Sequence, residues 1–465
     1  MIIRLAATKR RTTTVLGDQT STVASSFEFI ASFRRGRSQG VAADRVFSFL
    51  STGPFGSFIS RLTLVVVVWQ WWILTFAFAL LLFARNPSVL LAPRFWAEDG
   101  WVWYPDAYQY GLAALTRPIA GYLQTLPRLI ALVVEQARLV HAPALFAIAA
   151  FIIQLAPPLL LVSTRMAPAW PGNSRLIFAL VWILLPNSAE TFVNLTNSQW
   201  HFAAFAFLIL FSTPRLISDL SILLLSGLSG PFCIMLFPVA TWLAWNKPRR
   251  ASILRAACLG LTCLIQVPIV LMTHNERSPA FLGGSFDLLM RIVAQDILVS
   301  LLLGQTHMRW MQGVPGWVTT IIVLLAVFLT LVMLQRGPPI LKGAVVAAGA
   351  LFVAALVRPQ ISVDQAQWPL MLNPGTGQRY YLIPMLAWLG VLFTSAGSRV
   401  PWQRVSGYAL LMLSLIGITA DFHQPARPGP EWVSQAKRFE RAAPGSRQDF
   451  HFPPVPDAVM RLVKR

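Results

Sequence analysis

Two adjacent carboxylates, Glu98 and Asp99, lie in an aromatic run over residues 94–101. A carboxyl group that is partly buried beside a second negative charge has a raised pKa, which suits a general base acting on a hydroxyl group. Aromatic side chains near the pair, such as Trp96 and Tyr104, could stack on a sugar ring. The alternative is an acidic, aromatic loop at a membrane surface, with a nearby arginine as counter-ion. The spacing leaves open which carboxylate would be the base.

Amide and hydroxyl side chains are dense between Asn187 and Trp200. Among them, Asn194, Asn197 and Gln199 could hydrogen-bond a bound sugar. The same residue types also cap helices and close turns, so a structural role is the alternative.

An arginine follows a glycine-containing turn within residues 375–381, directly before an apolar segment. The guanidinium of Arg379 could hold a phosphate through paired hydrogen bonds, with Tyr380 beside it at the membrane interface. The alternative is an arginine that only extends its charge to the interface.

Metal and nucleotide chemistry have little support in the sequence. Cys233, Cys258 and Cys263 lie in apolar segments and suggest neither a disulfide framework nor a metal site. We find no phosphate-binding loop, zinc spacing or nucleophile elbow. We therefore expect no cofactor; a divalent metal ion is the alternative, which these residues do not support.

Membrane helices are the elements that must position these residues. Of the 465 residues, 55% are hydrophobic and 12% are charged, whereas soluble domains carry about 25% charged residues. An all-α bundle with about 11 membrane segments follows from the apolar stretches. They lie near 61–84, 143–163, 175–189, 200–213, 216–229, 230–245, 251–272, 317–335, 340–357, 381–396 and 403–420.

Three regions depart from simple spans. In the first outer loop, residues 127–140 have a helical pattern with Leu129 on the apolar side and Arg128 on the polar side, which predicts an interfacial helix. Residues 286–303 predict a second surface or re-entrant helix. The two short segments on either side of the turn at 226–231 predict a hairpin that meets inside the membrane or opens into a cavity.

The net charge of +20 reflects membrane topology rather than nucleic-acid binding, because the basic residues lie mostly in loops and tails. Their distribution predicts a basic, disordered cytoplasmic tail over 1–60, a membrane core over 61–420 and a Pro-rich, non-cytoplasmic tail over 421–465. The basic residues after 421 disagree with this orientation, but long terminal tails cross membranes largely regardless of charge.

The ordered set of features resembles the GT-C superfamily of membrane glycosyltransferases. It comprises a first span, paired acids in a long outer loop, a surface helix, many further spans and an aromatic-flanked arginine before a late span. The similarity to bacterial surface-polysaccharide transferases covers about 61–420. It is carried by the runs 95–100, 121–122, 126–128, 194–200 and 229–231.

This resemblance implies transfer of a sugar from a polyprenyl-phosphate-linked donor to a cell-envelope glycan or lipid acceptor. The protein would lie among the lipids of a bacterial inner membrane, with a cytoplasmic N-terminus and a periplasmic active site. Asp99 or Glu98 would deprotonate the acceptor, and Arg379 would bind the leaving phosphate. The residues implied in substrate binding are Trp96, Tyr104, Asn194, Asn197, Gln199 and Tyr380.

Two other functions fit a membrane protein. A transporter or flippase of lipid-linked saccharides should carry ionisable residues within its spans, near the middle of the bilayer. Here the spans are almost free of them, and the polar groups gather in the outer loops. A structural protein of the envelope would not depend on the two acids at all.

Overall fold

A computed structural model describes residues 54–273, 277–427, 431–452 and 459–465. The predicted N-terminal tail, residues 1–60, therefore lies almost entirely outside the described residues. The chain divides into two units, Met1–Ile73 and Leu74–Arg465. The second unit holds all of the predicted site residues.

The described residues are predominantly helical, as the sequence predicts, and each predicted apolar segment forms a helix. These helices are α3 (Pro54–Arg85), α7 (Ala142–Val162), α8 (Ser174–Ile183), α9 (Leu195–Phe211), α10 (Leu216–Gly227), α11 (Phe232–Asn246), α12 (Arg250–Met272), α15 (Gly316–Arg336), α16 (Pro339–Val357), α18 (Gln378–Ala396) and α19 (Pro401–Ala420). Pro339 and Pro401 begin α16 and α19, because proline fits the first turn of a helix and disfavours a helical residue before it.

Shorter elements, with η for 3-10 or π turns, form the loops and the C-terminal tail. They are α4 (Ser88–Leu91), η2 (Asp99–Trp103), α5 (Tyr104–Tyr110), η3 (Gly111–Thr116), α6 (Thr125–Glu135), η4 (Leu139–His141), η5 (Thr164–Met166), η6 (Ala189–Thr191), α13 (Phe286–Ile292), η8 (Val293–Val299), α14 (Ser300–Leu303), η9 (Gln305–Gly313), α17 (Gln367–Met371), α20 (Trp432–Arg441), β1 (Arg447–His451) and β2 (Val459–Val463). The predicted helix over 286–303 is thus continuous through α13, η8 and α14.

Long apolar helices indicate a membrane protein. Within the described residues, four helices are long and apolar enough to cross a membrane: Leu139–Val162, α12, α15 and α16. Large apolar side chains are exposed on α12, α15 and α19, including Leu264 at 74%, Leu325 at 64% and Met412 at 64%. Rows of exposed apolar side chains on such helices are typical of a surface that faces lipid.

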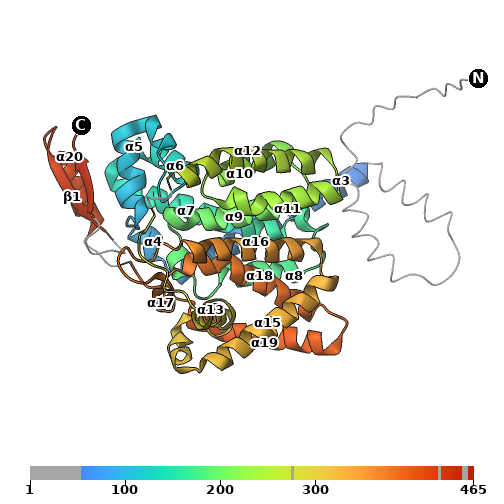
Figure 1. Cartoon of the computed structure of the whole chain (residues 1–465). Coiled ribbons are helices and arrows are strands. Elements are labelled where there is room, and N and C mark those ends of the chain that lie inside the picture. Colours follow the sequence, from blue (N-terminus) through green and yellow to red (C-terminus); the bar gives the residue numbers. More distant parts are fainter. Residues whose placement is uncertain (1–53, 274–276, 428–430, 453–458) are drawn as a thin grey trace, which may run out of the picture. The chain divides into compact units, whose positions relative to one another are not determined.

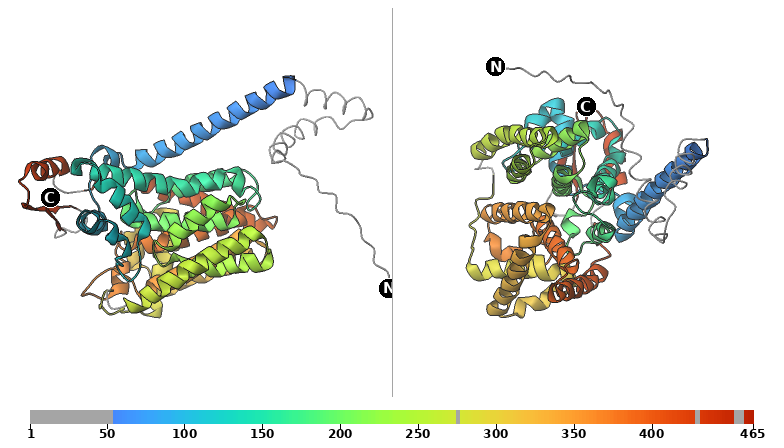
Figure 2. Two further views of the ribbon diagram at one scale, coloured as in Figure 1. Left: turned by 90° about the horizontal axis from the view of Figure 1, so that it is seen from above. Right: turned by 90° about the vertical axis from the view of Figure 1, so that its right-hand side faces the viewer.

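Helices α9 and α18 form the centre of the second unit. Most of their residues are buried, so neither helix shows the polar stripe of a surface helix. Helices α9, α10, α11 and α12 lie side by side, and α18 lies beside α16 and α19 (Figures 1 and 2). The N-terminal ends of α9 and α18 therefore bring the predicted amide and arginine segments to one region.

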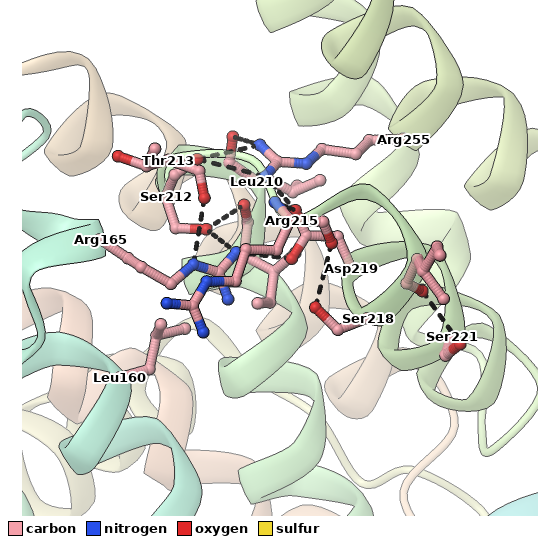
Figure 3. Close-up of polar contacts among 12 residues, drawn as sticks. Leu160, Arg165, Leu210, Ser212, Thr213, Arg215, Ser218, Asp219, Ser221 and Arg255 are labelled. Carbon is pink, nitrogen blue, oxygen red and sulfur yellow. Dashed lines mark hydrogen bonds and ion pairs between the residues drawn. The ribbon is translucent and has the colours of Figure 1, made fainter. Parts of the chain in front are cut away.

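A buried ionic cluster joins the helices at the other end of α9 (Figure 3). The fully buried Asp219 accepts hydrogen bonds from Arg165 and Arg255, each at 2.5 Å. Arg255 also donates to the carbonyl of Ser212, just after α9. Buried ionic and polar contacts therefore fix the C-terminal end of α9 to α10 and α12.

The C-terminal tail packs against the segment between α3 and α7, which the sequence predicts to be the first outer loop. Strands β1 and β2 are antiparallel, with Phe450 opposite Met460. The ring of Trp432 in α20 lies 4.9 Å from Phe95 and 5.4 Å from Phe450, and α20 and β1 lie at the same end of the unit as α5 (Figure 1). The tail that the sequence describes only as Pro-rich is thus a small folded element on the same side as the outer loop.

The interfacial helix of the outer loop is shorter and differently oriented than the sequence predicts. It is α6, and the described chain leaves the α-helical conformation after Glu135. Arg128, predicted on the polar outer side, is only 2% exposed. It donates to Asp106 at 2.7 Å and lies 5.1 Å from the ring of Trp103. An ion pair and an aromatic face compensate for burying its charge, and a helical pattern alone does not reveal such partners.

Helices α10 and α11 form the hairpin that the sequence predicts. Gln266 in α12 supports its turn, because its side-chain N–H groups donate to the carbonyls of Leu123, Gly227 and Gly230. After the turn, Phe232 lines the large cavity described next. The polar backbone of this turn is therefore paired by a buried side chain and lies next to the cavity.

Candidate active site

A cavity of about 1520 Å³ opens at the N-terminal ends of α9, α11 and α18. Six of the predicted site residues line it: Trp96, Glu98, Asn197, Gln199, Arg379 and Tyr380. They come from the outer loop, from α9 and from α18. Asp99, Tyr104 and Asn194 are not among the lining residues.

The two adjacent acids face different surroundings. Glu98 lines the cavity, whereas Asp99 is 2% exposed. Asp99 accepts hydrogen bonds from the backbone N–H of Thr196 at 2.7 Å, from its hydroxyl at 2.7 Å and from the backbone N–H of Leu195 at 3.3 Å. Neighbouring side chains in a helical turn point in different directions. One acid therefore holds the start of α9 while the other faces the cavity.

Burial changes the chemistry of Asp99. Burial raises the pKa of its carboxyl group to about 7, although the hydrogen bond from Thr196 and the charge of Arg427 oppose the change. Burial likewise lowers the pKa of Arg427 to about 10, opposed by Asp99. For both groups, burial therefore outweighs the attraction between the two charges.

Strained backbone presents several of these groups. Ala97, Ala120 and Val193 have φ angles of 46°, 51° and 40°, in the left-handed region that disfavours residues with a Cβ. Ala97 precedes Glu98, and Ala120 lies two residues before Tyr122, another lining residue. Such strain costs about 1–3 kcal/mol per residue and is typical of functional sites.

Arg379 has a partner that sequence reasoning did not find. Its side chain and its backbone N–H both donate to the carboxylate of Glu190, and its side chain also donates to the carbonyl of Gln360. The guanidinium lies 4.7 Å from the ring of Tyr380. Glu190 and Arg379 both line the cavity. The arginine that the sequence predicts to bind a phosphate is therefore part of an ion pair in this structure.

Other arginines make the cavity net positive. Arg277, Arg309, Arg358 and Arg427 line it together with Arg379, against the carboxylates of Glu98, Glu190 and Asp421. A cavity whose wall has five arginines and three carboxylates attracts an anion. These arginines are far apart in the sequence and follow no motif, so only the fold brings them together.

Asn194 and Asn197 shape the wall. The side-chain oxygen of Asn194 accepts from the backbone N–H of Asn197 at 2.8 Å, which caps α9. Both side chains also donate to the carbonyl of Glu190, each at 2.8 Å. Asn194 therefore caps a helix, which is the structural alternative that the sequence left open. The two amides also order the segment that carries Glu190.

Two aromatic residues of the outer loop have different positions. Tyr104 is 2% exposed and packs against Phe95 with ring centroids 5.4 Å apart, inside the loop's own core. Trp96 lines the cavity, and the guanidinium of Arg427 lies 5.1 Å from its ring. Arg427 also donates to the carbonyls of Phe192 and Val193, both at 2.8 Å. The start of the C-terminal tail thereby forms part of the cavity wall.

A second cavity of about 670 Å³ is lined mostly by apolar side chains of α8, α9, α16, α18 and α19. Phe232, Met235 and Leu351 line both cavities. A polar, cationic space therefore adjoins an apolar one between the helices.

Among the described residues, no group of three or more His, Cys, Asp or Glu side chains could hold a metal ion. Comparisons of the chain with protein-family models, with curated proteins and with solved structures gave no significant match.

Proposed function

We propose that this chain is a GT-C-type glycosyltransferase of a bacterial inner membrane, with about 11 membrane segments. It would transfer a sugar from a polyprenyl-phosphate donor to a glycan or lipid acceptor on the periplasmic side. One observation carries the proposal: Glu98 and a cationic, aromatic wall that includes Arg379 line a single cavity. The adjoining apolar cavity could take part of a lipid chain.

Glu98 is the general base in this mechanism. It accepts the proton of an acceptor hydroxyl, whose oxygen attacks the anomeric carbon of the donor sugar. The bond from that carbon to the phosphate oxygen breaks, and the electron pair leaves with the lipid phosphate. A phosphate is a good leaving group, so no strong general acid is required. General base catalysis of this kind contributes about 10²–10⁴-fold.

The arginines stabilise the departing charge. Arg379 can turn from Glu190 toward a phosphate because both groups line the cavity. Arg277 lies across Tyr122, with its guanidinium 5.9 Å from the ring. Charge-assisted hydrogen bonds from preorganised guanidinium groups are stronger in a cavity that excludes water. Asp99 is a positioning residue, since it fixes η2 to the start of α9.

The decisive experiment compares Glu98→Gln with the wild type in a strain that lacks the chain. Mass spectrometry of envelope glycans and lipid-linked sugars should show one missing sugar and a build-up of its carrier in the deletion strain. The wild type should restore the sugar, whereas Glu98→Gln should insert normally and fail to restore it. Unchanged glycans with Glu98→Gln would refute the enzymatic proposal, as a structural envelope protein predicts.

Detergent solution separates transfer from transport. A purified transferase should move sugar from the lipid carrier identified in the deletion strain to its acceptor without any closed compartment. A flippase would leave both compounds unchanged in detergent and move the carrier only across sealed vesicles.

A further inference from the structure

Three residues that line the cavity each carry a buried polar atom without a hydrogen-bond partner among the described residues. These atoms are the side-chain oxygens of Gln124 and Gln199 and the indole nitrogen of Trp200. The three residues are only 3%, 7% and 7% exposed, and all three line the large cavity. Buried polar groups are normally paired, so each unpaired group needs an explanation.

The three residues converge on the turn between α10 and α11. Gln124 forms an isolated antiparallel bridge with Ser229. The side-chain oxygen of Gln199 lies against Gly230, where an added Cβ would come within 2.8 Å of it. The ring of Trp200 meets that of Phe232 edge-on, with centroids 5.0 Å apart. We name Gln124, Gln199 and Trp200 the amide patch.

We propose that the amide patch binds the sugar ring of the lipid-linked donor through its hydroxyl groups. This inference rests on the proposed function and names the part of the cavity that recognises the sugar. A hydroxyl group both donates and accepts, so a polyol can satisfy an amide oxygen and an indole N–H together. All three side chains are neutral, which suits a neutral polyol better than a phosphate.

The patch lies close to the expected phosphate site. The guanidinium of Arg379 is 4.7 Å from the ring of Tyr380, and that ring is 5.7 Å from the ring of Trp200. The ring of Tyr380 would thus separate a phosphate held by Arg379 from the amide patch. This is a suitable separation for the sugar attached to that phosphate.

Apolar replacements of similar size test the patch. We would prepare Gln124→Met, Gln199→Met and Trp200→Phe in the full chain, in lipid nanodiscs. The probes are undecaprenyl phosphate and undecaprenyl phosphate linked to glucose, galactose, mannose or arabinose. The wild type should bind at least one sugar-linked lipid about tenfold more tightly than undecaprenyl phosphate, because neutral hydrogen bonds add affinity. In each variant, the preference for the sugar-linked lipid over undecaprenyl phosphate should fall about fivefold or more. The affinity for undecaprenyl phosphate itself should not change.

Gln266→Met is the matched control, because Gln266 is equally buried near the same turn and its amide is fully hydrogen-bonded. It should unfold at a clearly lower temperature. Gln124→Met and Gln199→Met should unfold at or above the wild-type temperature, because they remove unpaired polar atoms. If they unfold as early as Gln266→Met, their amides have structural partners and the subsite is overturned.

The binding outcomes separate this inference from the proposed function. A wild type that binds none of the five lipids would overturn both. A wild type that binds undecaprenyl phosphate and every sugar-linked lipid equally would overturn the subsite alone. Variants that keep the full preference for the sugar-linked lipid would also overturn it, while leaving the transferase proposal standing.

Discussion

Thr196 donates two hydrogen bonds to the carboxylate of Asp99, one from its backbone N–H and one from its hydroxyl, both at 2.7 Å. The contact fixes the outer loop to the first turn of α9. As a result, Glu98, the preceding residue, lines the cavity. The two acids that look equivalent in the sequence therefore have separable roles, and their variants should behave differently.

Asp99→Asn should change how stability depends on pH. Burial raises the pKa of Asp99 to about 7, so the folded protein keeps a proton that the unfolded chain releases above about pH 4. The protonated Asp99 therefore contributes stability below about pH 4, and this contribution is lost as the pH rises to about 7. The melting temperature of Asp99→Asn minus that of the wild type should increase between about pH 5 and pH 8. A difference that stays constant would contradict this, and Asp449→Asn, at an exposed strand position, is the control.

Arg379 and Glu190 should be energetically coupled. Their side chains are only 23% and 15% exposed, so Arg379→Gln alone leaves a partly buried carboxylate without its partner. We expect the double variant with Glu190→Gln to be more stable than Arg379→Gln, with a coupling energy on the order of 1–3 kcal/mol. The pair Arg461 and Asp449, whose side chains are 64% and 43% exposed, should couple by less than about 0.5 kcal/mol. Equal coupling in both pairs, measured by chemical unfolding, would argue against the buried contact.

Phe450→Ala should loosen the C-terminal element. The ring is fully buried between Trp432 and Phe439, at 5.4 and 5.6 Å. Its loss should cost about 3–5 kcal/mol and make the tail much more sensitive to trypsin while the helices remain protected. Val463→Ala, at a side chain 55% exposed, should be cleaved at the wild-type rate. Equal cleavage of both variants would mean that the tail is not anchored by this core.

Asp219→Asn should destabilise the end of α9 that is distant from the cavity. The substitution leaves Arg165 and Arg255 without their shared counter-charge (Figure 3). Breaking a buried ion pair in this way costs about 3–5 kcal/mol. Ser221→Ala, which removes an exposed hydrogen bond in the same helix, should change stability by less than about 0.5 kcal/mol. A melting temperature of Asp219→Asn equal to that of Ser221→Ala would contradict the role of the cluster.

Much of the helical framework could be predicted from the sequence. The apolar segment at 143–163 appears as Ala142–Val162, and that at 340–357 appears as Pro339–Val357. These features are local: a run of apolar residues must be helical to satisfy its backbone in lipid, and prolines and polar caps mark the ends. The capping role of Asn194 was likewise open to sequence reasoning, because its partner lies only three residues away.

The side chains that meet in the cavity were decided by tertiary structure. The partner of Arg379 lies 189 residues away at Glu190, and Gln124 pairs with Ser229 in the turn between α10 and α11. Sequence periodicity shows which side of a helix is apolar, but it does not show which other helix faces that side. Whether Glu98 or Asp99 faces the cavity depends on the packing of the outer loop against α9, because hydrogen bonds from Leu195 and Thr196 hold Asp99 there.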